Sequence, residues 1–211
     1  MDNAFLFWLT HFVLVRIYFD NAFLDNPLNV TIQDFLLSVE TDGNCQTGYR
    51  LNCEADPAGG PSRHFMYDHS APGDPWYDSV NNATGYVIEF SMKNAALITS
   101  GGVKFVITDG ARKWEVHINT NSIDSISGFA VPFTVPWNSM VYYNTYKFCV
   151  IGNSFELFVN GTLKTTGTLN VADATKSFLF QSYFTGLGVM MGEVWIQYVK
   201  YFLNGNTAPG T

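Results

Sequence analysis

Residues 153–166, Asn153-Ser-Phe-Glu-Leu-Phe-Val-Asn-Gly-Thr-Leu-Lys-Thr-Thr166, decide the fold class. Phe155, Leu157 and Val159 share one face of a strand, with Glu156 and Phe158 on the other, and the dipeptide Asn160-Gly161 follows at once. Successive side chains of a strand point to opposite faces, and Asn-Gly suits the positive φ angles of a two-residue turn. This stretch therefore predicts a β-hairpin closed by a type I′ turn.

Alternation recurs along the rest of the chain from residue 85 onward, with turn residues every eight to twelve positions. Residues 86–93 predict a strand with one dry face, made by Tyr86, Ile88, Phe90 and Met92, and a second face made by Val87, Glu89, Ser91 and Lys93. A second hairpin is expected where residues 103–107 and 114–118 flank the turn Asp109-Gly110. Residues 178–180 and 193–202 complete the set, the last being apolar on both faces as in a central strand. The pattern predicts an all-β, two-sheet antiparallel sandwich.

The 211 residues suffice for one domain, preceded by an apolar segment. We expect this segment to span residues 1–27 and the sandwich to span residues 28–211. Residues 4–15 are almost continuously apolar but are shorter than the ~20 residues needed to cross a bilayer, so no membrane span is expected. The segment is either signal-like or a retained strand or helix that makes subunit contacts. Residues 28–79 are rich in Gly and Pro and predict one or two strands with long loops.

The composition excludes some classes of partner. Only 14% of the residues are charged, the formal net charge is -7, and no cluster of Lys and Arg exists. Such a chain would repel a phosphate backbone, so nucleic acid is not expected as a partner. Low charge with many Asn, Thr, Gly and aromatic residues is typical of secreted β-rich proteins, which predicts an extracellular location or a cell or virion surface.

The three cysteines indicate the same setting. Cys45 and Cys53 lie eight positions apart in a turn-rich stretch and are predicted to form a disulfide; two free thiols or a metal site with nearby His residues are the alternatives. Cys149 lies in an apolar run and is expected to be buried. Glycosylation sequons occur at Asn29, Asn82 and Asn160.

Four stretches resemble the laminin G-like members of the concanavalin A-like lectin/glucanase superfamily. They are Asn82-Ala-Thr-Gly-Tyr-Val-Ile-Glu-Phe-Ser-Met-Lys93, Tyr143-Asn-Thr-Tyr-Lys-Phe148, Asn153-Ser-Phe-Glu-Leu-Phe-Val-Asn-Gly-Thr-Leu163 and Trp195-Ile-Gln-Tyr-Val-Lys-Tyr201. Asn144 stands where the family often has His, and Gln197 where Asp is commoner. The resemblance extends over about residues 80 to 209 and implies a concanavalin A-like jelly roll. Its motifs are structural, so they imply no activity.

The catalytic carboxylates of the superfamily's glucanases lie on one strand with alternate spacing, which turns them into the same cleft. Here each glutamate stands alone in its strand, at positions 89, 115, 156 and 193. We therefore expect no catalytic residues and no enzyme activity. No metal-ligand or cofactor motif is present; calcium held at the rim by scattered carboxylates and carbonyls stays open.

Five aromatic residues in or beside loops are candidate ligand-binding residues: Trp76, Tyr77, Trp137, Tyr142 and Tyr143. Flat apolar rings stack on sugars, but they equally cover the ends of a sandwich or lie in subunit contacts. Trp114 and Trp195 are assigned to the core, and His117 to a solvent-facing strand position.

Two functions follow. The first is a non-catalytic structural subunit of a filament, sheath or virion that self-associates through its apolar N-terminal segment. The alternative is a glycan-binding or adhesion module, and a glycoside hydrolase comes third.

Overall fold

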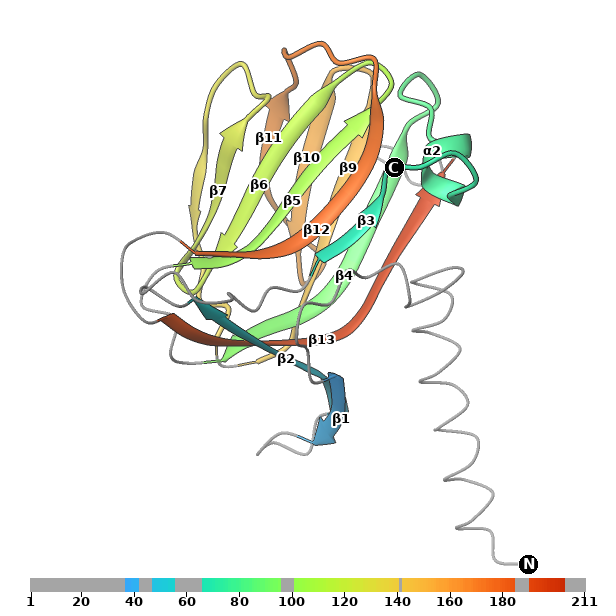
Figure 1. Ribbon diagram of the computed structural model, residues 1–211. Helices are drawn as coiled ribbons and strands as arrows, with labels where there is room; N and C mark the ends of the chain where they lie inside the picture. The colour runs from blue at the N-terminus through green and yellow to red at the C-terminus, as the bar shows by residue number, and fades with distance from the viewer. Residues whose placement is uncertain are drawn as a thin grey trace, which may run out of the picture.

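The computed structural model describes residues 37–41, 47–55, 66–95, 101–140, 142–184 and 190–203. Within these residues the strands form two antiparallel sheets that face each other, as Figure 1 shows. One sheet holds, in spatial order, β1 (Leu37–Thr41), β2 (Thr47–Ala55), β13 (Met190–Leu203), β4 (Tyr86–Ala95), β9 (Asn144–Ile151), β10 (Ser154–Val159) and β11 (Thr162–Thr168). We call it the seven-stranded sheet.

The opposite sheet, called the six-stranded sheet, contains β3 (Met66–His69), β12 (Lys176–Phe184), β5 (Gly101–Asp109), β6 (Lys113–Asn119), β7 (Ser122–Ser127) and β8 (Thr134–Pro136) in spatial order. The predicted all-β, two-sheet antiparallel sandwich is therefore confirmed.

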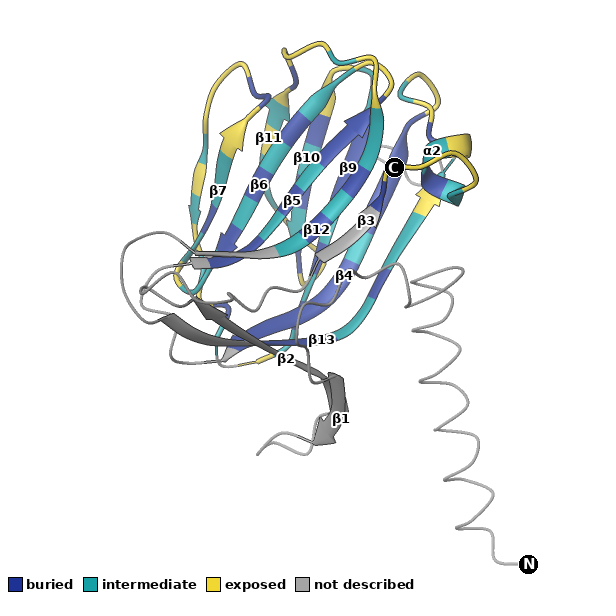
Figure 2. Cartoon of the chain, in the orientation of Figure 1, coloured by how far each residue is buried: buried dark blue, intermediate teal, exposed yellow. Residues whose placement is uncertain are grey.

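Aromatic side chains from both sheets fill the space between them, and Figure 2 shows the buried positions running along the strands. The Phe90 ring of β4 lies 4.4 Å from the Phe105 ring of β5, centroid to centroid, and stacks on Tyr146 at 5.0 Å. Trp114 is fully buried and contacts Phe148 edge-on. The core therefore lies where alternation placed it, since Tyr86, Ile88, Phe90 and Met92 are all at most 1% exposed.

Both predicted hairpins form. Val159 pairs with Thr162 across a two-residue loop in which Asn160 has φ 51° and Gly161 has φ 74°. At the other hairpin, the Asp109 amide donates to the Arg112 carbonyl at 3.1 Å, and Gly110 takes φ 88°. As expected for a central strand, β13 lies between β2 and β4.

The described parts of the Gly- and Pro-rich region contain more strands than its composition predicts. They contribute three strands, β1, β2 and β3, instead of one or two, and a short helix, α2 (Pro75–Ser79), that no pattern indicated. Helix α2 begins at a proline, whose missing N–H is tolerated in a first turn, and packs beside β12 and β3. Five residues are too short to show a helical period. The proposed N-terminal segment, residues 1–27, lies outside the described residues.

Candidate functional site

The face of the seven-stranded sheet that points away from the core, called the outer face below, carries both charged and aromatic side chains. Pairing across the strands aligns them in rows. One row runs Lys200, Glu89, Lys147 and Phe158 over β13, β4, β9 and β10. The next row runs Phe202, Val87, Cys149, Glu156 and Thr166 and reaches β11. Residues far apart in the sequence are thus neighbours on one surface.

Glu89 is the centre of a polar cluster in the first row. Its Oε1 accepts a hydrogen bond from the Tyr198 hydroxyl at 3.0 Å and forms an ion pair with the Lys200 ammonium at 2.6 Å. A register shift between Ile196 and Tyr198 in β13 lets Tyr198 reach the outer face. The Lys200 ammonium also lies 5.6 Å from the Phe202 ring, whose side chain is 43% exposed.

Lys93 forms a second cluster at the other end of β4. Its ammonium lies 5.0 Å from the Trp195 ring and 5.1 Å from the Tyr143 ring, within the range of cation–π attraction. Between the clusters, the Ser91 hydroxyl donates to Gln197 Oε1 at 2.7 Å. Because Lys93 and Trp195 are each only 7% exposed, they lie beneath the surface and offer a ligand little contact area.

The middle of the outer face is less completely paired. The Lys147 ammonium lies 5.6 Å from the Phe158 ring, and none of the ion pairs among the described side chains includes it. Glu156 Oε2 is shielded from solvent and has no hydrogen-bond donor among the described residues. Cys149 lies two residues after Lys147 on β9 and pairs with Glu156 across to β10, and burial raises the pKa of its thiol to about 11. Cys149 is buried as expected, but on the outer face.

The five candidate aromatic residues do not form one site. Trp76 is fully buried in the core beside Tyr86, whereas Tyr77 follows it in α2 at the surface of the sandwich. Trp137 packs against the core and lies under the Lys164 ammonium at 4.5 Å. Tyr142 is 62% exposed, and Tyr143 alone of the five joins the outer face, through Lys93.

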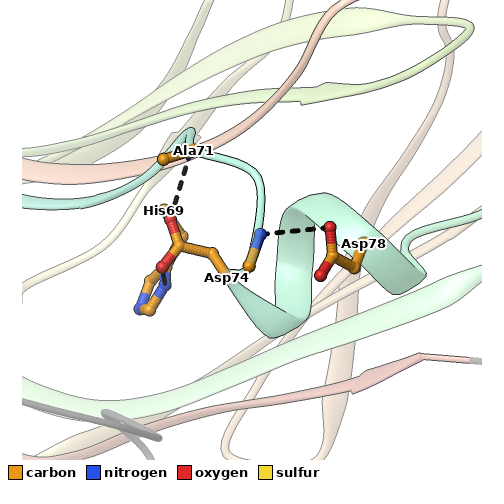
Figure 3. Close-up of polar contacts among 5 residues, drawn as sticks. His69, Ala71, Asp74 and Asp78 are labelled. Atoms are coloured by element: carbon orange, nitrogen blue, oxygen red, sulfur yellow. Dashed lines mark hydrogen bonds and ion pairs between the residues drawn. The ribbon is translucent and has the colours of Figure 1, made fainter.

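The loop before α2 is held by its aspartates, as the close-up in Figure 3 shows. Asp74 accepts a hydrogen bond from the Ala71 amide at 3.1 Å, and Asp78 accepts one from the Gly73 amide at 3.3 Å. Asp74 also lies 3.4 Å from Nδ1 of the buried His69. The first two contacts order the loop and the third connects it to β3, while the Trp76 ring packs on Tyr86 and Phe178 in the core.

A hollow of about 420 Å³ opens at the rim between α2 and the turn after β5. It is lined by Asp78, Asn81, Asn82, Asp109 and Lys176, among others. Asp109 is 2% exposed and already accepts hydrogen bonds from Asn82 and Tyr86, so it has little capacity left for a ligand. Among the described side chains, no three of the metal-ligating types gather here or elsewhere.

The sequons differ in their surroundings. The Asn82 amide nitrogen donates to Asp109 at 2.8 Å and to the Gly152 carbonyl at 2.8 Å, so a glycan there would displace one of two hydrogen bonds. Asn160 is exposed in its turn. Asn29, Cys45 and the side chain of Cys53 lie outside the described residues, and the disulfide stays a prediction.

The six-stranded sheet has a polar outer surface of its own. His117 Nε2 lies 2.6 Å from Glu115 Oε1, and that hydrogen bond keeps the pKa of Glu115 below its ordinary value. His117 is therefore on an outward-facing position as expected, although its side chain is only 12% exposed. Between described side chains, every cation that lies over an aromatic ring is found away from the strands of this sheet.

Sequence reasoning missed most of the outer face. Trp195 is buried as expected, at 7% exposed, but its ring packs beside Lys93 and outside the hydrophobic cluster between the sheets. Sequence reasoning treated the glutamates as isolated, whereas Glu89 is paired with Lys200 and Tyr198. The available signal for these outer-face residues was the second face of residues 86–93. It becomes informative only once β13 is known to pair with that strand.

No protein-family model and no curated protein matches the chain, whereas several solved structures have a similar fold. Bacillus licheniformis β-glucanase aligns at a TM-score of 0.55 and 16% identity over 86% of this chain and 95% of that one. The PL7 alginate lyase AlyA1 from Zobellia galactanivorans aligns at 0.50 and 12% over 82% and 94%. The binding domain of botulinum neurotoxin DC in complex with SialylT aligns at 0.50 and 9% over 82% and 42%.

At these identities the likeness establishes architecture alone. In the described part of the chain, no helix is long and apolar enough to cross a membrane. Two facing antiparallel sheets, their strand order and the similar structures lead to one conclusion: the chain has the concanavalin A-like jelly-roll fold.

Proposed function

We propose that the chain is a non-catalytic glycan-binding module whose ligand lies on the outer face of the seven-stranded sheet. The observation that carries this proposal is the pair of aligned rows. Exposed Phe202 offers an apolar ring, and beside it Lys200 offers a donor and the carboxylate oxygen of Glu89 that Lys200 and Tyr198 do not contact offers an acceptor. A sugar presents an apolar ring face and a rim of hydroxyls, which this combination suits.

The similar structures support the class of ligand, since their names include a glucanase and an alginate lyase. They lend no support to a structural subunit, and the N-terminal segment on which self-association depends lies outside the described residues. Binding is favoured over hydrolysis because Glu89 Oε1 is engaged by both Lys200 and Tyr198. A laminin G-like relationship and an extracellular location complete the proposal.

The test is binding of the full chain to a polysaccharide array and to insoluble polysaccharides. Phe202→Ala should weaken binding about tenfold, which is what loss of one stacking ring costs. Ile126→Ala is the matched control, because Ile126 is 52% exposed on the six-stranded sheet. Equal losses in both variants, or no polysaccharide bound, would contradict the site. Release of reducing ends from a bound polymer would show that the module is an enzyme.

A further inference from the structure

Among the described residues, the middle of the outer face combines a cation without an ion-pair partner and a carboxylate oxygen without a hydrogen-bond donor. Lys147 is partly exposed, and Glu89, its partner across the strands, is already paired with Lys200 on the other side. Glu156 follows on the next strand, diagonal to Lys147, with Oε2 lacking a donor. The two do not satisfy each other, since no ion pair joins them among the described side chains.

The described side chains of this face carry more positive than negative charge. Its described side chains include the lysines Lys93, Lys147 and Lys200 against the glutamates Glu89 and Glu156, whereas the whole chain carries a formal net charge of -7. Screening limits the influence of distant carboxylates to about 8 Å at physiological salt. The electrostatic potential that acts on a ligand at this face is therefore set mainly by the nearest lysines.

We propose that the ligand is an acidic polysaccharide, in which a sugar carboxylate pairs with Lys147 and a neighbouring hydroxyl donates to Glu156. This rests on the proposed function and names its ligand class. A uronic acid carries both groups on one ring, and its apolar face can lie on Phe158, beside which Lys147 is placed. An acceptor shielded from water without a donor is unfavourable, so Glu156 gains by turning toward a hydroxyl.

The experiment compares matched polymers with the full chain. Alginate, polygalacturonate and hyaluronate are each tested beside their carboxyl-reduced neutral forms by affinity electrophoresis and calorimetry. At physiological salt, at least one acidic polymer should bind about tenfold more tightly than its neutral form, as expected for one charge-assisted contact. Lys147→Gln should reduce that ratio to about twofold or less. Lys104→Gln removes the same charge from the six-stranded sheet and should leave the ratio unchanged.

The Glu156→Gln variant distinguishes two effects that the Glu156 carboxylate could have on ligand binding. If Glu156 accepts a hydroxyl, the variant weakens acidic and neutral polymers alike; if it merely repels the carboxylate, the variant binds the acidic polymer more tightly, and its assigned role is wrong. Equal binding of acidic and neutral polymers, or equal loss in Lys147→Gln and Lys104→Gln, overturns the acidic ligand class while glycan binding stands. Binding to no polysaccharide on the array overturns both proposals.

Discussion

The Asp109 carboxylate forms hydrogen bonds to segments that lie far apart in the sequence. Its Oδ1 accepts from the Ala111 and Arg112 amides, and its Oδ2 from the Asn82 amide and the Tyr86 hydroxyl. Tyr86 in turn accepts from the Trp114 indole at 2.8 Å. The sequence identified Asp109 as a turn residue, but its long-range partners arise only when the two sheets meet.

Asp109→Asn should destabilise the chain by about 2 kcal/mol or more. Both carboxylate oxygens accept hydrogen bonds, so the NH₂ group of an asparagine would face N–H or O–H donors in a buried network. Asp78→Asn is the control, since Asp78 is exposed and accepts from Gly73. Urea unfolding measures both. A loss in Asp109→Asn no larger than in Asp78→Asn would show that the network contributes little.

At the scale of elements, local chemistry predicted the hairpins and failed where partners are distant. Asn160-Gly161 fixed its turn because both residues tolerate positive φ. The outer-face site could not be read in the same way, since Glu89 and Lys200 lie 111 positions apart and meet only through the pairing of β4 with β13. Helix α2 was missed because five residues carry no period, and its position depends on Asp74 and Asp78.

Alanine substitutions at two glycines with positive φ distinguish the cost of backbone strain from the cost of a steric clash. Gly161 has φ +74° with nothing within 4 Å of an added Cβ, so Gly161→Ala should cost about 1 kcal/mol. Gly128 has φ +90°, and an added Cβ would lie 2.1 Å from the Lys113 carbonyl oxygen, so Gly128→Ala should cost about 3 kcal/mol or more. Thermal unfolding compares them. Equal losses would mean that the chain near Lys113 shifts to make room.

For the whole molecule, buried protons should limit stability in alkali. Burial raises the pKa of Cys149 to about 11, and burial likewise raises the pKa values of Tyr86 and Tyr146, with the Asp109 charge adding to that of Tyr86. A group whose pKa rises on folding contributes stability below its unfolded pKa, and that contribution is lost as pH rises through the folded pKa. The free energy of unfolding should therefore fall from about pH 9 upward.

Tyr146→Phe removes one of these protons and keeps the ring that stacks on Phe90. It should reduce the alkaline loss of stability, whereas Tyr142→Phe, at a residue 62% exposed, should not. Urea unfolding in reductant at several pH values from neutral to alkaline measures the difference. A parallel decline in both variants and the wild type would assign the alkaline transition to other groups.

The position of β13 has a consequence for how the protein is made. This strand of 14 residues lies between β2 and β4, so it joins the two parts of its sheet. During synthesis on a ribosome, β2 and β4 emerge long before their common neighbour, and they cannot be united until β13 has been translated. Non-local pairing of this kind folds slowly. The nascent chain must therefore carry unpaired strand edges through most of its translation, and a chaperone that shields them would act in that interval.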